Sequence, residues 1–141
     1  MKYVKPQLLT ARILEVLGLR QHCHIVLVID LDEAARRFVC ETLRKHGYEV
    51  MEASDVEAAM QVLRQHRVHL VFSDVATSEQ HGVETIQRMR RFFPDIKIVA
   101  MSREIPAEVL KMCSFLGADA ALAKPIAADL LLKTTRRLLA A

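Results

Sequence analysis

Glycine is scarce in this 141-residue sequence, and its four glycines are isolated from one another: Gly18, Gly47, Gly82 and Gly117. The phosphate-binding loop GxxxxGK(S/T) and the dinucleotide-binding turn GxGxxG both need closely spaced glycines, so neither can be formed. The sequence also lacks a Ser, His and Asp set with a nucleophile elbow. These absences argue against an NTPase, a nucleotide-dependent dehydrogenase and a serine hydrolase.

Cysteine is rare as well. Cys23, Cys40 and Cys113 are odd in number, widely spaced and free of any CxxC motif, so neither a disulfide framework nor a zinc site is predicted. The run His22-Cys23-His24 contains good ligands for zinc or copper. Three successive residues of an extended chain cannot all face one ion, however, and we interpret this run as an ordinary linker.

Long apolar runs are absent too. None approaches the roughly 20 residues that a membrane-spanning helix needs, and the N-terminus lacks the features of a secretion signal. We therefore expect a cytoplasmic protein that does not bind membranes. The net charge of +3 is small and the positive residues are spread along the chain, so no direct nucleic-acid binding is expected. Arg88, Arg90 and Arg91 are expected to lie on the wet side of a helix.

The composition that remains, 52% hydrophobic with only 5% aromatic residues, indicates one domain with an aliphatic core. Short apolar runs, typical of strands buried on both faces of a parallel sheet, each end abruptly in a polar residue. Because the carboxyl ends of parallel strands meet at one edge, these residues should lie close together. The runs are 25–29, 69–74, 96–101 and 120–123, and the residues that end them are Asp30, Asp74, Ser102 and Lys124.

Segments of helical period alternate with these runs, and Tyr48–Ala53 alternates as a strand at a partly exposed edge does. Asp32 is a candidate N-cap for the first helix, Ser54 opens a capping box for the second, and Pro106 opens the fourth. Five β-α units with right-handed crossovers are predicted. The predicted core faces are Ala35, Phe38, Val39, Thr42 and Leu43; Val56, Ala59, Met60 and Leu63; Val83, Ile86, Met89 and Phe93; Val109, Met112, Cys113 and Leu116; and Ala127, Leu130, Leu131, Thr134 and Leu138.

The order acid, acid, hydroxyl and lysine at successive strand ends resembles the receiver domain of bacterial response regulators, over residues 25 to 140. Gly82, eight residues after Asp74, and the intact Lys124-Pro125 pair add to this resemblance. It implies an α/β fold in residues 25–141: a three-layer αβα sandwich with a five-stranded parallel sheet in the order 2-1-3-4-5.

The resemblance also implies a function in two-component signalling. Asp74 would accept a phosphoryl group from a histidine kinase or phosphotransfer protein, while Ser102 and Lys124 would bind the phosphoryl oxygens. Asp30, Asp74 and the backbone of Ala76 would hold Mg²⁺. Such a domain acts by protein–protein interaction on an output protein. We expect no enzymatic activity beyond gaining and losing that group.

Several positions depart from the family pattern. Leu31 replaces the second acid after the first strand, which predicts weak or absent Mg²⁺ binding, and Asp32 compensates only if its loop turns. Arg103 replaces a small residue and, with Glu104, should modulate the site, either by obstructing the pocket or by bringing a fixed positive charge to Asp74. Ser78 stands where Pro is common. The position of the family's aromatic switch falls near Ala120 or Ala121.

These features leave two principal hypotheses. A phosphoaccepting receiver is favoured by Asp74, Ser102 and Lys124, whereas a phosphorylation-independent pseudo-receiver, a protein-binding module, is favoured by Leu31 and Arg103. A DNA-associated regulator acting as a dimer is a weaker third hypothesis, because no helix-turn-helix segment follows the last strand.

Residues 1–24 form an N-terminal extension outside the resemblance. Pro6 and Gly18 bracket a predicted amphipathic helix with Leu9, Ile13, Val16 and Leu17 on one face. That face is too apolar to stay in water. It should pack on its own domain or on another chain, and a homodimer is one outcome.

Overall fold

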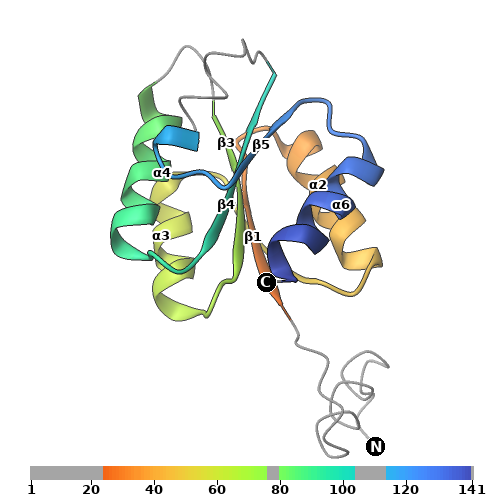
Figure 1. Ribbon diagram of the computed structural model, residues 1–141, viewed down its shortest axis with the longest axis horizontal. Helices are drawn as coiled ribbons and strands as arrows, with labels where there is room; N and C mark the ends of the chain where they lie inside the picture. The colour runs from red at the N-terminus through yellow and green to blue at the C-terminus, as the bar shows by residue number, and fades with distance from the viewer. Residues whose placement is uncertain (1–23, 76–79, 104–113, 141) are drawn as a thin grey trace, which may run out of the picture.

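The computed structural model describes residues 24–75, 80–103 and 114–140, with side chains omitted for 80–82. Its centre is a parallel sheet in the order β2-β1-β3-β4-β5 (Figure 1). The strands are β1 (Ile25–Ile29), β2 (Glu49–Ala53), β3 (Leu70–Asp74), β4 (Lys97–Ser102) and β5 (Ala120–Ala123). The predicted sheet and strand order are therefore confirmed.

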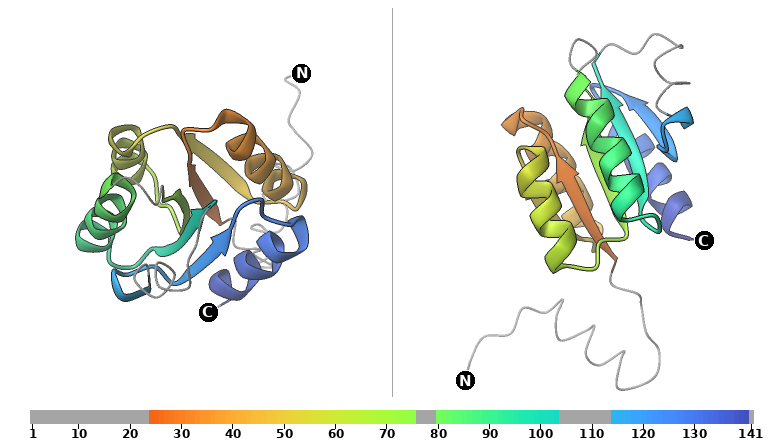
Figure 2. Two further views of the ribbon diagram at one scale, coloured as in Figure 1. Left: turned by 90° about the horizontal axis from the view of Figure 1, so that it is seen from above. Right: turned by 90° about the vertical axis from the view of Figure 1, so that its left-hand side faces the viewer.

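Helices cover both faces of this sheet. They are α2 (Glu33–Lys45), α3 (Val56–Gln65), α4 (Gln80–Phe92) and α6 (Ala128–Leu139). Helices α2 and α6 lie on one face and α3 and α4 on the other, as both views show (Figures 1 and 2). The three-layer αβα arrangement follows from the sequence, because strands apolar on both sides must be covered on both sides.

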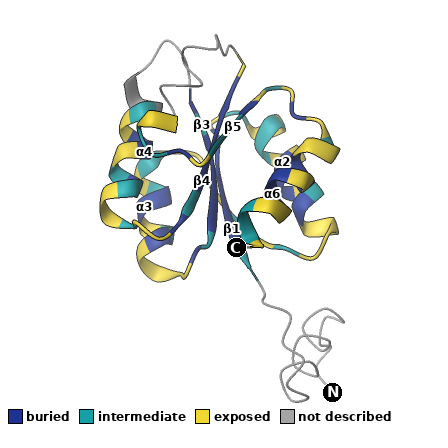
Figure 3. Cartoon of the chain, viewed as in Figure 1, coloured by how far each residue is buried: buried dark blue, intermediate teal, exposed yellow. Residues whose placement is uncertain are grey.

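Two buried clusters, one on each face of the sheet, form the core (Figure 3). Alternate residues of β1 show the division, since Leu27 packs with Met60 and Ile86 while Val28 packs with Leu43 and Leu131. The expected core face of α3 is confirmed at Ala59, Met60 and Leu63.

The predicted core faces of two helices are wrong in detail. Phe38 is 45% exposed, and the buried side of α2 consists of Val39, Cys40 and Leu43. Apolar residues of α2 lie on two adjoining sides of the helix. In the structure the helix is rotated so that Cys40, which is smaller than Phe38, faces the core. At the last helix, Ala127 is exposed and Leu130 is 46% exposed, while Leu131 and Leu132 are buried.

Two of the predicted helix starts lie in the described residues, and the structure confirms one of the two predicted caps. Asp32 caps α2 as predicted, with its side chain accepting from the backbone N–H groups of Ala34 and Ala35. Helix α3 is capped by Asp55, not by Ser54, and the Asp55 carboxylate accepts from Ala58 N at 2.8 Å. A charged oxygen at the positive end of the helix explains this preference.

Arg90 of α4 is not the solvated residue that the sequence predicts. Its guanidinium donates to the backbone oxygens of Pro94, Ile96 and Gly117 at 2.6 to 3.0 Å and pairs with Asp119 at 2.8 Å. It therefore joins the end of α4 to the start of β4 and to the turn before β5.

Several predicted features lie outside the described residues. They are the N-terminal helix between Pro6 and Gly18, the helix start at Pro106, and the positions of Ala76, Ser78 and Glu104. Within the described parts of the chain, no helix is long and apolar enough to cross a membrane.

Candidate functional site

The predicted site residues come together at the carboxyl edge of the sheet. Asp30 directly follows β1, Asp74 ends β3, Ser102 ends β4 and Lys124 follows β5. Backbone hydrogen bonds continue the ladder past these strand ends, from Val75 N to Met101 O at 2.7 Å and from Lys124 N to Ser102 O at 2.8 Å. The sheet therefore fixes where each side chain begins.

Lys124 is the centre of this site. Its Nζ atom lies 2.5 Å from Asp30 Oδ2 and 2.7 Å from Asp74 Oδ1. The side chains of Lys124 and Asp30 are 8% and 1% exposed, whereas that of Asp74 is 27% exposed. One ammonium group thus joins two carboxylates that end neighbouring strands, and Asp74 is the carboxylate that solvent can reach.

Asp30 has both carboxylate oxygens engaged. Oδ2 contacts Lys124, and Oδ1 accepts from the backbone N–H of Asp32 at 2.9 Å. A carboxylate this deeply buried needs such partners, since an unpaired buried charge costs several kcal/mol. Asp30 is therefore a positioning group for Lys124 and has no oxygen left without a partner.

Arg103 lies at the rim of the site and pairs with Asp32, their Nη2 and Oδ2 atoms 2.5 Å apart. Among the described residues, the expected contact between Arg103 and Asp74 is not formed, because Lys124 already holds that carboxylate. Arg103 nevertheless adds a positive charge beside the site. Asp32 keeps its capping role and does not turn away from α2.

The surroundings of Asp32 favour its charged form. Hydrogen bonds from the backbone N–H groups of Ala35 and Ala34, with the positive charge of Arg103 beside them, hold the pKa of this carboxyl below its ordinary value of 3.8. The aspartate is thus a fixed negative group at neutral pH.

Arg36 is a site residue that sequence reasoning missed. Its Nη1 atom donates to the backbone oxygen of Asp30 at 2.7 Å, and its Nε atom pairs with Glu52 at 3.1 Å. Burial alone would raise the pKa of Glu52, but Arg36 and Arg44 outweigh that effect and lower it. The available signal in the sequence was the spacing, because Arg36 follows the N-cap residue Asp32 by four residues, which is about one helical turn.

An apolar groove of about 510 Å³ opens beside the site between α2 and the start of α6. Ala35, Phe38, Val39 and Ile126 line it, and Arg103 and Lys124 border it. Leu31, two residues after the end of β1, is 80% exposed to solvent. The site therefore combines a reachable carboxylate and two cations with an adjacent apolar surface.

The geometry allows the Asp74 carboxylate to attack an incoming anionic group. A carboxylate with one oxygen held by an ammonium can act as a nucleophile, and the cation can neutralise the oxygens of the group transferred. Ser102, 4% exposed, ends the strand that neighbours β3 and brings a hydroxyl to the same edge. In the described ranges, no cluster of three His, Cys, Asp or Glu side chains is arranged to hold a metal ion.

Comparison with known proteins identifies the family of this chain. The family described as the response regulator receiver domain matches residues 26–136. The sensor histidine kinase RcsC of Salmonella typhimurium is 30% identical over 110 residues, which are 78% of this chain and 12% of that protein. The sporulation initiation phosphotransferase F of Bacillus subtilis is 25% identical over 104 residues, 74% of this chain and 84% of that protein.

Solved structures show the same fold. A response regulator from Thermotoga maritima has a TM-score of 0.79 and 27% identity, covering 84% of this chain and 98% of its own. The chemotaxis protein CheY4 of Vibrio cholerae has a TM-score of 0.76 and 29% identity, covering 82% of this chain and 98% of its own. The chain spans 12% of the length of the kinases it matches first, but most of each of these two structures. The match over residues 26–136, together with the sheet order and the site, assigns the chain to the response regulator receiver domain family.

Proposed function

We propose that this receiver accepts a phosphoryl group on Asp74, from a histidine kinase or a phosphotransfer protein, and acts as a single-domain protein through contacts with an output protein. Receiver domains are signalling modules of two-component systems and typically are not enzymes. The observation that supports the proposal is the orientation and the exposure of the Asp74 carboxylate. Its carboxylate is oriented by Lys124 at 2.7 Å and is still 27% exposed to an incoming donor.

The other two acids are less suited to the reaction. Asp30 is buried with both oxygens engaged, and Asp32 is held by the first turn of α2 and by Arg103. An attack from either would leave Lys124 or the helix N-terminus without its partner. Asp74 gives up only one contact, and the cation of that contact can follow the charge onto the new group.

In the proposed step, an Asp74 oxygen attacks the phosphorus of a phosphoimidazole. The new O–P bond forms as the P–N bond breaks, and the imidazole leaves with the bonding electron pair and takes up a proton. Lys124 neutralises the oxygens of the phosphoryl group, and Ser102 donates a hydrogen bond to one of them. Arg103 adds positive charge at the rim.

Receiver domains generally bind Mg²⁺ in their acidic pocket, but the residues here fit this ion poorly. Leu31 stands in place of an acid, both oxygens of Asp30 have partners, and Lys124 lies between Asp30 and Asp74. Three carboxylates and two side-chain cations leave one net negative charge. Because Mg²⁺ needs nearly octahedral oxygen ligands, we propose that it binds weakly and that no step depends on tight binding.

Phosphorylation is tested with a small-molecule phosphodonor and mass spectrometry of the intact chain. Wild-type protein and an Asp32→Asn control should each gain one phosphoryl group, whereas Asp74→Asn should gain none. Labelling of Asp74→Asn to the level of wild type would contradict the assignment of the nucleophile.

Metal binding is tested by titrating wild type and the Leu31→Asp, Arg103→Ala double variant with Mg²⁺ and following amide NMR shifts. The wild type should bind in the millimolar range or more weakly, because Mg²⁺ keeps few protein ligands and loses one here. The double variant should bind at least tenfold more tightly. Submillimolar binding by the wild type would show that another group replaces the missing acid.

A second candidate function is a phosphorylation-independent binding module. The pair Arg103–Asp32 and the exposed Leu31 favour it, because they fill the rim of the site with groups that phosphoryl transfer does not need. Binding of the output protein separates the two functions. A receiver switched by phosphorylation should lose phosphodonor-dependent binding in Asp74→Asn, whereas a constitutive module should bind equally in both forms.

A further inference from the structure

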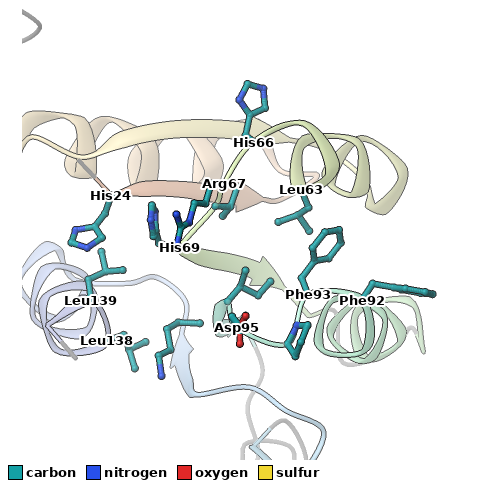
Figure 4. Close-up of a pocket in the computed structure, with 14 residues that line it drawn as sticks. His24, Leu63, His66, Arg67, His69, Phe92, Phe93, Asp95, Leu138 and Leu139 are labelled. Atoms are coloured by element: carbon teal, nitrogen blue, oxygen red, sulfur yellow. The ribbon is translucent and has the colours of Figure 1, made fainter. Parts of the chain in front are cut away.

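A second pocket of about 500 Å³ lies at the opposite edge of the sheet, where the strands begin (Figure 4). Its apolar lining includes Leu63 of α3, Phe93 after α4 and Leu139 at the end of α6. The figure shows these side chains around one hollow, with His24 and His69 along the strand starts. The pocket therefore extends beneath the starts of β1, β3 and β4, from one helical layer to the other.

The apolar groups around this pocket are only partly covered by their own domain. Phe93, Leu138 and Leu139 are half-buried, and Phe92 at the margin is 58% exposed. A surface hollow whose lining combines half-exposed apolar side chains with histidine and charged groups offers a place for another segment or molecule. The proposed phosphoryl chemistry, at the other edge of the sheet, makes no use of it.

The path of the chain points to one occupant. His24, the first described residue, itself lines the pocket, and its backbone oxygen accepts from Glu49 N at 3.3 Å. Its ring lies edge-to-face on His69 with ring centroids 5.1 Å apart. His69 is fixed in turn, because its Nδ1 atom accepts from Ile25 N at 3.1 Å. The 23 residues before His24 must therefore start from the pocket's own rim.

The sequence of those residues matches the pocket in chemistry. Leu9, Ile13, Val16 and Leu17 recur at helical spacing between Pro6 and Gly18. A helix over residues 6–17 would be about 18 Å long. The seven steps from Leu17 to His24 can span up to about 25 Å, which is enough for the helix to turn back under the sheet.

We propose that residues 6–17 form an amphipathic helix that packs into this pocket of the same chain. Because the linker is short, the local concentration of the helix at the pocket reaches the millimolar range, which favours docking within one chain over docking between two copies. Residues 6–17 have no net charge, because Arg12 is balanced by Glu15, while the pocket rim carries Arg67, Asp95 and Lys97. Burial of apolar side chains therefore drives the contact, and added salt should not weaken it.

The test compares two full-length variants that differ only in the helix face that receives a charge. Ile13→Glu places a carboxylate in the apolar stripe, and Ala11→Glu places it on the opposite side of the helix. The amide NMR signals of Val68, His69 and Lys97 should shift in Ile13→Glu but not in Ala11→Glu. The melting temperature should fall by roughly 5 °C or more in Ile13→Glu alone.

A double-variant comparison ties the effect to the pocket. Leu139→Ala, in the lining, and Ile13→Ala together should lower the melting temperature by less than the sum of their separate effects. Leu130→Ala, on the same helix outside the pocket, should be additive with Ile13→Ala. Unshifted pocket amides, or strict additivity for Leu139, would overturn the proposal. Sedimentation of wild type as a dimer that Ile13→Glu dissociates would overturn it in favour of a second copy of the chain.

Discussion

Replacement of Lys124 by Met tests whether the site is held together by its ion pairs. The Nζ atom of Lys124 lies within 2.7 Å of both Asp30 and Asp74, and Lys124 and Asp30 are almost completely buried. Removal of one partner from a buried pair costs about 3–5 kcal/mol, because the other charge remains without compensation. Asp30 keeps its hydrogen bond from Asp32 N, and Asp74 can be hydrated. We therefore expect a loss of about 3 kcal/mol in the free energy of unfolding.

This loss is large against the total stability of about 5–15 kcal/mol that domains of this kind have, and urea denaturation at pH 7 should measure it directly. Lys133→Met, at an exposed position of α6, is the matched control and should change the free energy by less than about 0.5 kcal/mol. The double variant Asp30→Asn, Lys124→Met should recover about half of the loss, since its buried carboxylate is gone. A loss below about 1 kcal/mol in Lys124→Met, or no recovery in the double variant, would refute this explanation.

Three further predictions concern single groups elsewhere in the domain. Gly47→Ala should lower the free energy of unfolding by roughly 1 kcal/mol, because the φ angle of Gly47 is +88° although no atom lies within 4 Å of the new Cβ. Gly117→Ala should lower it by at least about twice as much, because φ is +113° and the new Cβ would lie 3.0 Å from the Arg90 side chain. Urea denaturation of the two variants compares these effects. Burial first, and then the negative charge of Glu52, raises the pKa of Cys40 from 9.0 to about 12. With the other two cysteines changed to Ser, a thiol reagent at pH 8 should therefore react with native protein about a thousandfold more slowly than with unfolded protein, and equal rates would be inconsistent with a buried thiol. The pKa of Asp32 is lowered on folding, so its stabilising effect is present above 3.8 and is lost as the pH falls below that value. The stability difference between wild type and Asp32→Asn should hence be constant well above pH 3.8 and shrink as the pH falls below that value; a difference that stays constant below it would mean that the Asp32 charge does not contribute.

Sequence reasoning predicted which residues meet at the candidate site, because a strand end is visible as the place where an apolar run stops. Asp30, Asp74 and Lys124 each follow such a run, and a parallel sheet has to bring them to one edge. The choice of partner was not predictable in the same way. Arg103 has a long side chain that could reach several acids, and the structure pairs it with Asp32 because Lys124 already holds Asp74.

The errors in the helices have a related cause. The sequence of α2 carries apolar residues on two adjoining sides, so periodicity alone does not decide between Phe38 and Cys40. Arg90 was misread because most of its partners are backbone oxygens, of Pro94, Ile96 and Gly117, and a carbonyl group leaves no mark in a sequence. Rotation of a helix and hydrogen bonds to the backbone are decided only when the layers pack.

The two outermost strands of the sheet, β2 and β5, limit how this protein can aggregate. Strand β2 carries Glu49 and Glu52, so a strand of another chain that paired with β2 would lie beside these carboxylates. Strand β5 at the other edge has only four residues and lies between Asp119 and Lys124. Charged or very short edge strands are poor templates for further strands. Growth into extended β-assemblies is thus disfavoured at both edge strands, even though the central strands are mostly apolar.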